Sequence, residues 1–173
     1  QVQAGFAQSP FGECLIAQSP RGVCHLSFSE AGESRVAALA RVAEAWPNAQ
    51  IERDDPWATQ LIGRVFSTPP ATARRTRVNR LRVLVRGSTF QVRVWRALVS
   101  IAPGTLISYG SLADTLGMAG AARAVGSAVA RNNIAYLIPC HRVIRETGVV
   151  GEYRWGHERK RVLLAWEGAR AAG

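Results

Sequence analysis

The sequence has no long hydrophobic run, and its apolar stretches fall well short of the roughly 18 consecutive residues that a membrane-spanning helix needs. Its first residues, QVQAGF, lack the basic and apolar regions of a secretory signal. They also lack an initiator methionine, so we expect the 173 residues to be a domain of a longer protein. With 47% hydrophobic and 20% charged residues, the composition excludes a disordered tail and favours one compact domain or two small ones.

Cysteine is scarce, and its odd count without paired spacing excludes a disulfide framework and favours a reducing, cytoplasmic setting. The conceivable metal ligands are Cys14, Cys24, His25, Cys140 and His141. None of them forms the C-x₂₋₄-C or H-x₃₋₅-H spacing of a zinc site, so we expect no metal and no cofactor.

Acidic residues are also few, with 12 against 22 basic ones and a net charge of +10. Lys160 is the only lysine, and all other basic residues are arginines, whose guanidinium groups suit phosphate. This balance favours a nucleic-acid partner. A GC-rich genome with a merely soluble surface would give the same composition, so charge alone leaves both explanations open.

The first 86 residues predict a small α/β layer without a catalytic motif. Apolar segments at 14–17 and 23–28 flank the turn sequence SPRG at 19–22, which predicts a hairpin. A further strand is predicted at 78–85 from the alternation of Leu81, Val83 and Val85.

Two helices are predicted in the same half. The first covers 34–46, and its expected inner face consists of Val36, Leu39, Ala40, Ala43 and Trp46. The second begins at Asp55-Pro56, runs to Phe66 and ends at Pro69-Pro70.

The second half is richer in helices. Ser88 is the expected N-cap of a helix that reaches Ile101, and Ser108 that of a helix from Tyr109 to Leu116, ended by Gly117. Another helix is predicted at 121–131, after a turn of small residues. Two short helices across such a turn are typical of a helix-turn-helix, although any pair of antiparallel helices gives the same pattern.

The segment LIPCHRVI at 137–144 carries the clearest chemistry. A cysteine nucleophile acts as the thiolate, and the adjacent His141 is the natural base for Cys140. Neighbouring side chains in an extended segment point apart, so the pair needs a turn or a bridging water. Glu167 is an acid that could orient the imidazole. Cys140 as a buried apolar residue, or as the nucleophile of a hydrolase, stays an alternative.

The sequence PCHRV at 139–143 resembles the acceptor-cysteine signature of the O6-alkylguanine-DNA alkyltransferases. GSTFQVRVW at 87–95, ISYGSLA at 107–113 and ARAVG at 122–126 are similar to further motifs of that family. GEYRWG at 151–156 resembles the GYRWG of the bacterial adaptive-response (Ada) subgroup, in the C-terminal alkyltransferase domain of that protein. The five motifs occur in the family's order.

The resemblance implies an α/β fold with a ribonuclease-H-like α/β layer over 1–86, followed by a mostly helical half over 87–173 with a winged helix-turn-helix-like motif. The implied activity is irreversible, single-use transfer of a methyl group from O6-alkylguanine, or from O4-alkylthymine, in double-stranded DNA to the protein. The implied protein is a monomer of the bacterial cytoplasm, at the nucleoid, with no membrane partner. The alternative is a sensor that binds alkylated bases without catalysis.

By the same resemblance, Cys140 accepts the alkyl group, His141 deprotonates it through a water, and Glu167 orients His141. Tyr109 donates a proton to guanine N3, and Asn132 holds the active-site turn. The implied DNA-binding residues are Tyr109, Ala122, Arg123, Ala124, Gly126, Ser127 and Arg131. Arg123 is expected to fill the space of an extruded base, between small residues that let the helix enter a groove only about 6 Å wide.

The implied alkyl pocket is lined by Val129, Pro139, Tyr153, Arg154 and Trp155. The bulky Trp155 is expected to disfavour benzyl relative to methyl groups. Gly151 and Glu152 depart from the subgroup, which has Ser and Gly at these places, and so put the position of the pocket loop in doubt. The zinc-binding cysteines of mammalian relatives and the regulatory module of Ada have no counterpart here, so no gene-regulatory role is expected.

Overall fold

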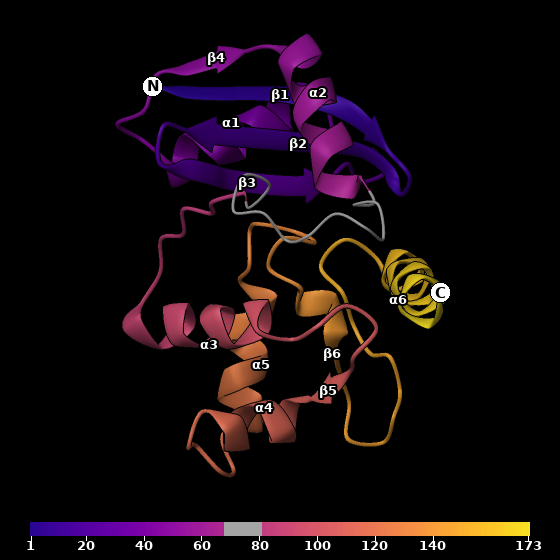
Figure 1. Ribbon diagram of the computed structural model, residues 1–173. Coiled ribbons are helices and arrows are strands. Elements are labelled where there is room, and N and C mark those ends of the chain that lie inside the picture. Colours follow the sequence, from indigo (N-terminus) through magenta and orange to yellow (C-terminus); the bar gives the residue numbers. More distant parts are fainter. Residues whose placement is uncertain (68–80) are drawn as a thin grey trace. The chain divides into compact units, whose positions relative to one another are not determined.

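The computed structural model describes residues 1–67 and 81–173 and divides the chain into two compact units, Gln1–Leu84 and Val85–Gly173 (Figure 1). The predicted end of the second helix at Pro69-Pro70 and the first residues of the predicted strand at 78–85 lie outside the described residues. Within the described ranges, no helix combines the length and the apolar character that crossing a membrane requires.

The first unit is built on a four-stranded sheet with the order β3-β2-β1-β4. Strands β1 (Val2–Ser9), β2 (Gly12–Ser19) and β3 (Gly22–Phe28) form two antiparallel hairpins, and β4 (Ile51–Arg53) pairs parallel to β1. The predicted hairpin is confirmed, whereas β1 and β4 were not predicted. Of the predicted strand at 78–85, the described part forms one isolated parallel bridge, between Val83 and Val23.

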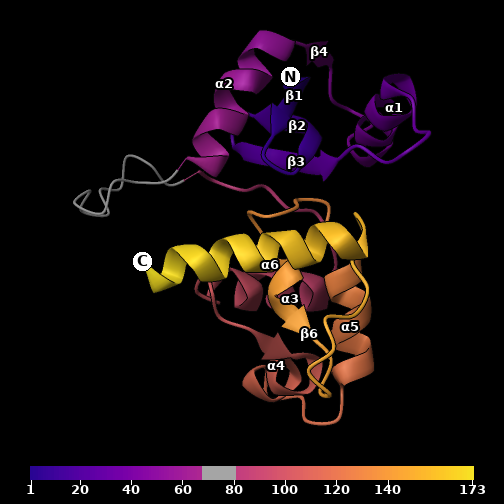
Figure 2. The same ribbon diagram turned by 90° about the vertical axis from the view of Figure 1, so that its right-hand side faces the viewer.

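Helices α1 (Arg35–Ala45) and α2 (Asp55–Phe66) cover opposite faces of this sheet (Figure 2). Both predicted helices are confirmed. The predicted inner face of α1 is right for Leu39 and Trp46, which pack against the core, and wrong for its other three residues. Ala38 and Val42 are its buried residues and pack on Val2, Ala4 and Phe6, while Val36 is 78% exposed. Ala40 and Ala43 are exposed as well. An alanine-rich helix offers weak contrast between its faces, so the sheet that it meets decides which side is buried.

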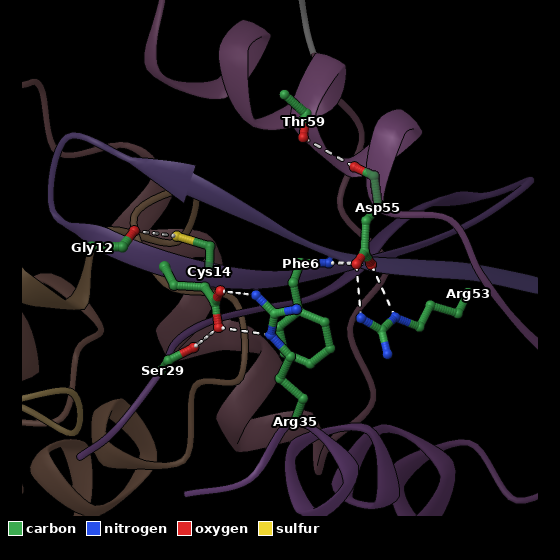
Figure 3. A network of polar contacts seen from close by, with 9 residues as sticks. Phe6, Gly12, Cys14, Ser29, Arg35, Arg53, Asp55 and Thr59 are labelled. Atoms are coloured by element: carbon green, nitrogen blue, oxygen red, sulfur yellow. Dashed lines mark hydrogen bonds and ion pairs between the residues drawn. The ribbon is translucent and has the colours of Figure 1, made fainter. Parts of the chain in front are cut away.

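Arginine–carboxylate pairs tie the helix starts to the sheet (Figure 3). Arg35, at the start of α1, pairs with Glu13 of β2. Asp55, at the start of α2, pairs with Arg53 at 2.8 Å and accepts the N–H of Phe6 at 3.0 Å. Both guanidinium groups lie over the Phe6 ring, at 5.0 and 5.3 Å from its centroid. The hydrogen bond from Arg53 comes first among the causes that lower the pKa of Asp55 to about 2, against a smaller rise from burial.

The second unit is mainly helical. Helix α3 (Thr89–Val99) begins at a capping box of Ser88 and Gln91, and α4 (Tyr109–Thr115) begins at Ser108, so both predicted N-caps are confirmed. A turn leads to α5 (Ala122–Ala130), and Trp95 of α3 donates its indole N–H to the Ala128 carbonyl at 3.0 Å. The remaining elements are β5 (Ile107–Ser108), β6 (Val143–Ile144), parallel to β5, and the C-terminal α6 (His157–Ala172).

Close packing of α2 on β1 depends on Gly5, and a side chain there is expected to destabilise the first unit. A Cβ at this position would lie 2.3 Å from the Asp54 carbonyl oxygen and 2.8 Å from the Ala58 Cβ, so the helix would have to move. We expect Gly5→Ala to lower the free energy of unfolding by about 1–3 kcal/mol in urea denaturation. Gly63→Ala, in the same helix with nothing within 4 Å, is the control and should stabilise by about 0.5–1 kcal/mol. Equal changes in the free energy of unfolding for Gly5→Ala and Gly63→Ala would contradict a special role of Gly5 in this packing.

Candidate active site

Cys140 and His141 lie in a single turn of 3₁₀ helix, Cys140–Arg142, which follows Pro139 and leads into β6. Pro139 and all three turn residues are buried. The turn replaces the extended geometry in which neighbouring side chains would point apart. A turn or a bridging water was expected between Cys140 and His141, and the structure contains the turn.

Asn132 binds this turn from the end of α5. Its side chain is 1% exposed, and its Nδ2 donates to the carbonyls of Ile134 and Ile138 at 3.2 and 3.0 Å and to the Cys140 Sγ at 3.3 Å. Its Oδ1 accepts the Ile134 N–H at 2.9 Å. One buried amide thus connects the helix end, the connecting segment and the sulfur atom.

Glu167 of α6 binds two side chains of the same turn. Its Oε1 accepts from His141 Nε2 at 3.0 Å and from Arg142 Nη2 at 2.6 Å, and its Oε2 accepts from Arg142 Nε at 2.9 Å. Arg142 also donates to the Ile101 carbonyl after α3. Glu167 is 2% and His141 0% exposed, so these charge-assisted bonds lie in the interior, where water screens them little.

The environment sets the protonation states of the site. Burial would raise the pKa of Glu167, but hydrogen bonds from Arg142 and His141 outweigh it and lower that pKa to about 2. An ionised carboxylate only accepts, so His141 Nε2 carries the hydrogen, and Nδ1 is the basic nitrogen of the neutral ring. Nδ1 is buried and has no hydrogen-bond partner within the described ranges. Burial also lowers the pKa of His141 and raises that of Cys140, which favours neutral imidazole and thiol at rest.

Lys160 of α6 adds a buried cation beside this site. Its side chain is 0% exposed, and Nζ donates to the carbonyls of Val143 at 2.7 Å and Glu152 at 3.2 Å. Burial lowers the pKa of Lys160 to about 8, while the charge of a Cys140 thiolate acts to raise it. In turn, the Asn132 hydrogen bond and the Lys160 charge act to lower the pKa of Cys140, against its burial.

The predicted DNA-binding residues lie on α4 and α5. Tyr109 is half-buried, and its pKa is raised by burial and by the charge of Cys140, which couples it to the thiol. On α5, Arg123, Ala124 and Ser127 are exposed, as is Arg131 just after it, whereas Ala122 and Gly126 are half-buried. A Cβ on Gly126 would meet the Tyr109 ring at 3.5 Å, so these two helices approach closely at this point.

The predicted pocket residues differ in exposure. Val129 and Pro139 are buried, and so are Tyr153 and Trp155, whose rings meet edge to face at 5.3 Å. The Tyr153 ring also meets the His141 ring edge to face, with 6.5 Å between the ring centroids. Arg154 is exposed, lies 5.5 Å over the Trp155 ring and donates to the Asn132 carbonyl at 3.0 Å and to the Asn133 Oδ1 at 2.5 Å. The loop that carries these residues is therefore bonded to the same helix end as the cysteine turn.

Sequence reasoning missed three parts of this site, Arg142, Lys160 and Glu146. Glu146 accepts the Ser108 hydroxyl at 2.6 Å and the Gly110 N–H at 2.8 Å, and so ties the segment after β6 to the start of α4. The signal for Lys160 was present, because one lysine among so many arginines suggests a site that a guanidinium does not fit. Arg142 and Glu146 gave no local signal, since their partners lie 25 and 36 or more residues away.

Comparison with known proteins decides the family. The family model for the DNA-binding domain of 6-O-methylguanine DNA methyltransferase matches residues 89–169. The crystal structure of Mycobacterium tuberculosis OGT in complex with DNA is similar to this chain with a TM-score of 0.73 and 31% identity, over 97% of this chain and 94% of that one. The chain belongs to the O6-methylguanine-DNA methyltransferase family. The resemblance inferred from the motifs is confirmed, and the fold is the mixed α/β fold of these structures.

This chain matches only part of the length of its curated relatives in the O6-methylguanine-DNA methyltransferase family. The regulatory protein Ada of Salmonella typhimurium is 40% identical over 91% of this chain and 43% of its own length. The methylated-DNA–protein-cysteine methyltransferase of Mycobacterium tuberculosis is 52% identical over 50% of this chain and 53% of its own length. The chain thus spans about half the length, or less, of these curated relatives.

The geometry around Glu167 predicts a large loss of stability when its charge is removed. Glu167→Gln leaves the buried Arg142 guanidinium without a counter-charge, so we expect the free energy of unfolding at pH 7 to fall by about 3–5 kcal/mol. Because the folded pKa is about 2, below the ordinary 4.5, this contribution is complete above pH 4.5 and disappears as the pH falls towards 2. Urea denaturation at several pH values measures both effects.

Glu158→Gln is the matched control on the same helix. Glu158 is 81% exposed, and its carboxylate lies 3.6 Å from Arg161, so its replacement should change stability by less than about 0.5 kcal/mol. Equal losses for the two variants would show that the buried pairing of Glu167 adds nothing to the fold.

Proposed function

We propose that this chain repairs double-stranded DNA by transferring a methyl group irreversibly from the O6 atom of guanine to Cys140. The observation that carries the proposal is one buried turn in which Asn132 donates a hydrogen bond to the Cys140 Sγ and the next residue, His141, has its Nε2 bound to the ionised carboxylate of Glu167. This is the arrangement of a nucleophile, a base and an orienting acid. We further propose a bacterial cytoplasmic setting at the nucleoid, which the DNA substrate and the similarity to bacterial relatives support.

The transfer begins with the thiol and a neutral imidazole. The thiol proton passes to His141 Nδ1, through a water in the scheme that the motif resemblance implies, and Glu167 stabilises the resulting imidazolium. The sulfur then attacks the methyl carbon, a sulfur–carbon bond forms, and the bond from carbon to O6 breaks with its electron pair left on the guanine. Tyr109 donates a proton to N3 of the guanine and is left as a tyrosinate. The imidazolium then loses its proton to solvent and the tyrosinate regains one, so that in sum the guanine gains the one proton that the thiol loses.

The product explains why the protein is used once. A methyl thioether has no readily displaced group, so Cys140 does not return to the thiol. Lys160 supports the thiolate stage, because its charge opposes the effect of burial on the Cys140 pKa. Asn132 supports it through the hydrogen bond to the sulfur atom.

For DNA binding we propose that α4 and α5 form a helix-turn-helix, with β5 and β6 as a short wing, and that α5 enters the minor groove. The exposed Arg123 and Arg131, the small residues between them and the net charge of +10 support this role. Arg123 then fills the space of the extruded base. The order β3-β2-β1-β4, with β4 parallel to β1, supports a ribonuclease-H-like arrangement of the first unit.

For the pocket we propose that Val129, Pro139, Tyr153, Arg154 and Trp155 surround the alkyl group. The burial of Trp155, which is 4% exposed and held by Tyr153 and Arg154, supports a narrow pocket that prefers methyl to benzyl. The bonds from Arg154 to the end of α5 keep this pocket next to the cysteine turn.

Intact-mass spectrometry after mixing with an O6-methylguanine duplex tests the transfer. We expect one methyl adduct per protein, on Cys140, because a spent thioether blocks a second turnover, and we expect none on Cys140→Ala. Cys24→Ala is the matched control and should take up one methyl group, since burial raises the pKa of Cys24 to about 11 and its thiol bonds the Ala17 carbonyl. Lesion-selective binding without an adduct would favour the sensor, and multiple turnover would favour a hydrolase.

Base extrusion by Arg123 predicts a dependence on the form of the substrate. Arg123→Ala should slow methyl transfer from a duplex by at least about 10-fold, because extruding a paired base costs a few kcal/mol. Transfer from a single-stranded oligonucleotide should change little, because that base is already unstacked. Single-turnover rates on both substrates measure this difference, and Arg96→Ala, at an exposed position of α3, is the control. Equal slowing on both substrates would contradict a role in extrusion.

A further inference from the structure

Tyr136 has an unusual backbone within the segment that delivers the cysteine turn. Its φ is 65°, and no other residue of the described ranges except glycine has a positive φ. A bulky side chain in this conformation costs free energy and persists where the surrounding structure enforces it. The enforcing contacts surround it: Ile138 N–H donates to the Ile134 carbonyl, and Asn132 binds both of these residues through its side chain.

This backbone brings the Tyr136 ring onto the face of His141. The two rings are nearly parallel, with 6° between their planes and 6.0 Å between their centroids, a distance typical of offset stacking. Trp166 of α6 meets the Tyr136 ring edge to face at 6.0 Å, and the guanidinium of Arg170 lies 3.7 Å over the Trp166 ring. The stack on His141 is therefore supported from the helix that also carries Glu167.

A single hydrogen bond leaves the imidazole ring free to rotate. The bond from Nε2 to Glu167 fixes the position of one ring atom, but the ring can still turn about that point. A flat ring on its face removes this freedom and so fixes the direction of Nδ1. The negative face of the tyrosine ring also stabilises the imidazolium that forms when Nδ1 takes a proton.

We propose that Tyr136 is a positioning residue of the transfer reaction, which holds the plane of His141 by stacking and favours its protonated form. This inference rests on the proposed function, because it concerns the proton taken from Cys140. It also gives the strained backbone a reason, since the conformation at Tyr136 is what places its ring on the imidazole.

The electrostatic surroundings of His141 come from several elements. Helix α6 supplies the carboxylate of Glu167 and the ammonium of Lys160, and the turn itself supplies the Arg142 guanidinium and the Cys140 thiol. Two tyrosine rings, those of Tyr136 and Tyr153, contact the imidazole. None of them except Tyr136 changes in the variants below, so a shift in the titration of His141 reports the loss of the stacked ring.

The test compares Tyr136→Leu, which keeps apolar bulk, with Tyr136→Phe, which keeps the ring. For a protein used once, the amplitude of methyl transfer counts competent molecules, and the rate constant reports the chemistry. We expect Tyr136→Leu to keep its amplitude, to lose about 3- to 10-fold in rate constant, and to move the acid limb of the pH–rate profile about 0.5 to 1 unit lower, because the imidazolium is less stable. Tyr136→Phe should match the parent protein.

Histidine ring NMR gives a readout independent of transfer. The titration of His141 should move to lower pH in Tyr136→Leu and stay where it is in Tyr136→Phe. A lower amplitude with an unchanged rate constant and pH profile would show that Tyr136 only supports the fold and would overturn the inference. No transfer by the parent protein would instead overturn the proposed function, and the NMR titration would then still decide whether the stack acts on His141.

Discussion

Glu167 brings one negative charge into the interior of the second unit, where an imidazole and a guanidinium share it. The carboxylate joins the last helix to the cysteine turn through three hydrogen bonds, and Arg142 extends the link to the end of α3. Because the lowered pKa keeps the Glu167 carboxylate ionised near neutral pH, the carboxylate can only accept a hydrogen bond from His141 Nε2. Nδ1 is therefore the basic nitrogen of His141. The packing of α6, the geometry of the turn and the direction of the proposed proton transfer thus depend on the same two oxygen atoms.

The segment between α5 and β6 is held by polar and aromatic contacts as well as by apolar packing. Asn132 closes it at the start, Tyr136 adopts a left-handed backbone in its middle, and the turn at Cys140 ends it. Each of these features restricts the chain at a point where a flexible loop would allow the cysteine to swing. The transfer that we propose gains from such rigidity, because a nucleophile that is used once depends on correct placement and not on release and renewal of the same group.

Burial has opposite effects on the groups of the site, and the structure uses both. It keeps Cys140 protonated and His141 neutral, which protects the thiol from ionising and reacting elsewhere. Lys160 and Asn132 lower the cost of the thiolate without making it the resting form. The arrangement is consistent with a thiol that reacts when a bound alkyl group is in place, and not with a freely reactive surface cysteine.

Elements whose signals are local can be predicted from the amino-acid sequence. Ser88 and Ser108 cap helices through bonds that span three residues, the SPRG turn joins two strands, and five ordered motifs identify the family. The caps and the turn are predictable because they depend on residue type and short spacing. The hydrogen bonds of Asn132 to the Cys140 Sγ and of His141 to Glu167 span 8 and 26 residues, and these pairs were expected from the family resemblance.

Packing between distant segments selects the valine of α1 that is buried and the strands with which β1 and β4 pair. It also selects the partners of Arg142, Lys160 and Tyr136. Val36 and Val42 look alike in the sequence, but the sheet covers only the second. Arg142 is the last residue of the cysteine turn and gives no local sign of the carboxylate that it binds. The stacking of Tyr136 on His141 requires a backbone conformation that its residue type disfavours. Contacts between residues far apart in the chain carry no signal in residue spacing, because packing of the whole unit creates them.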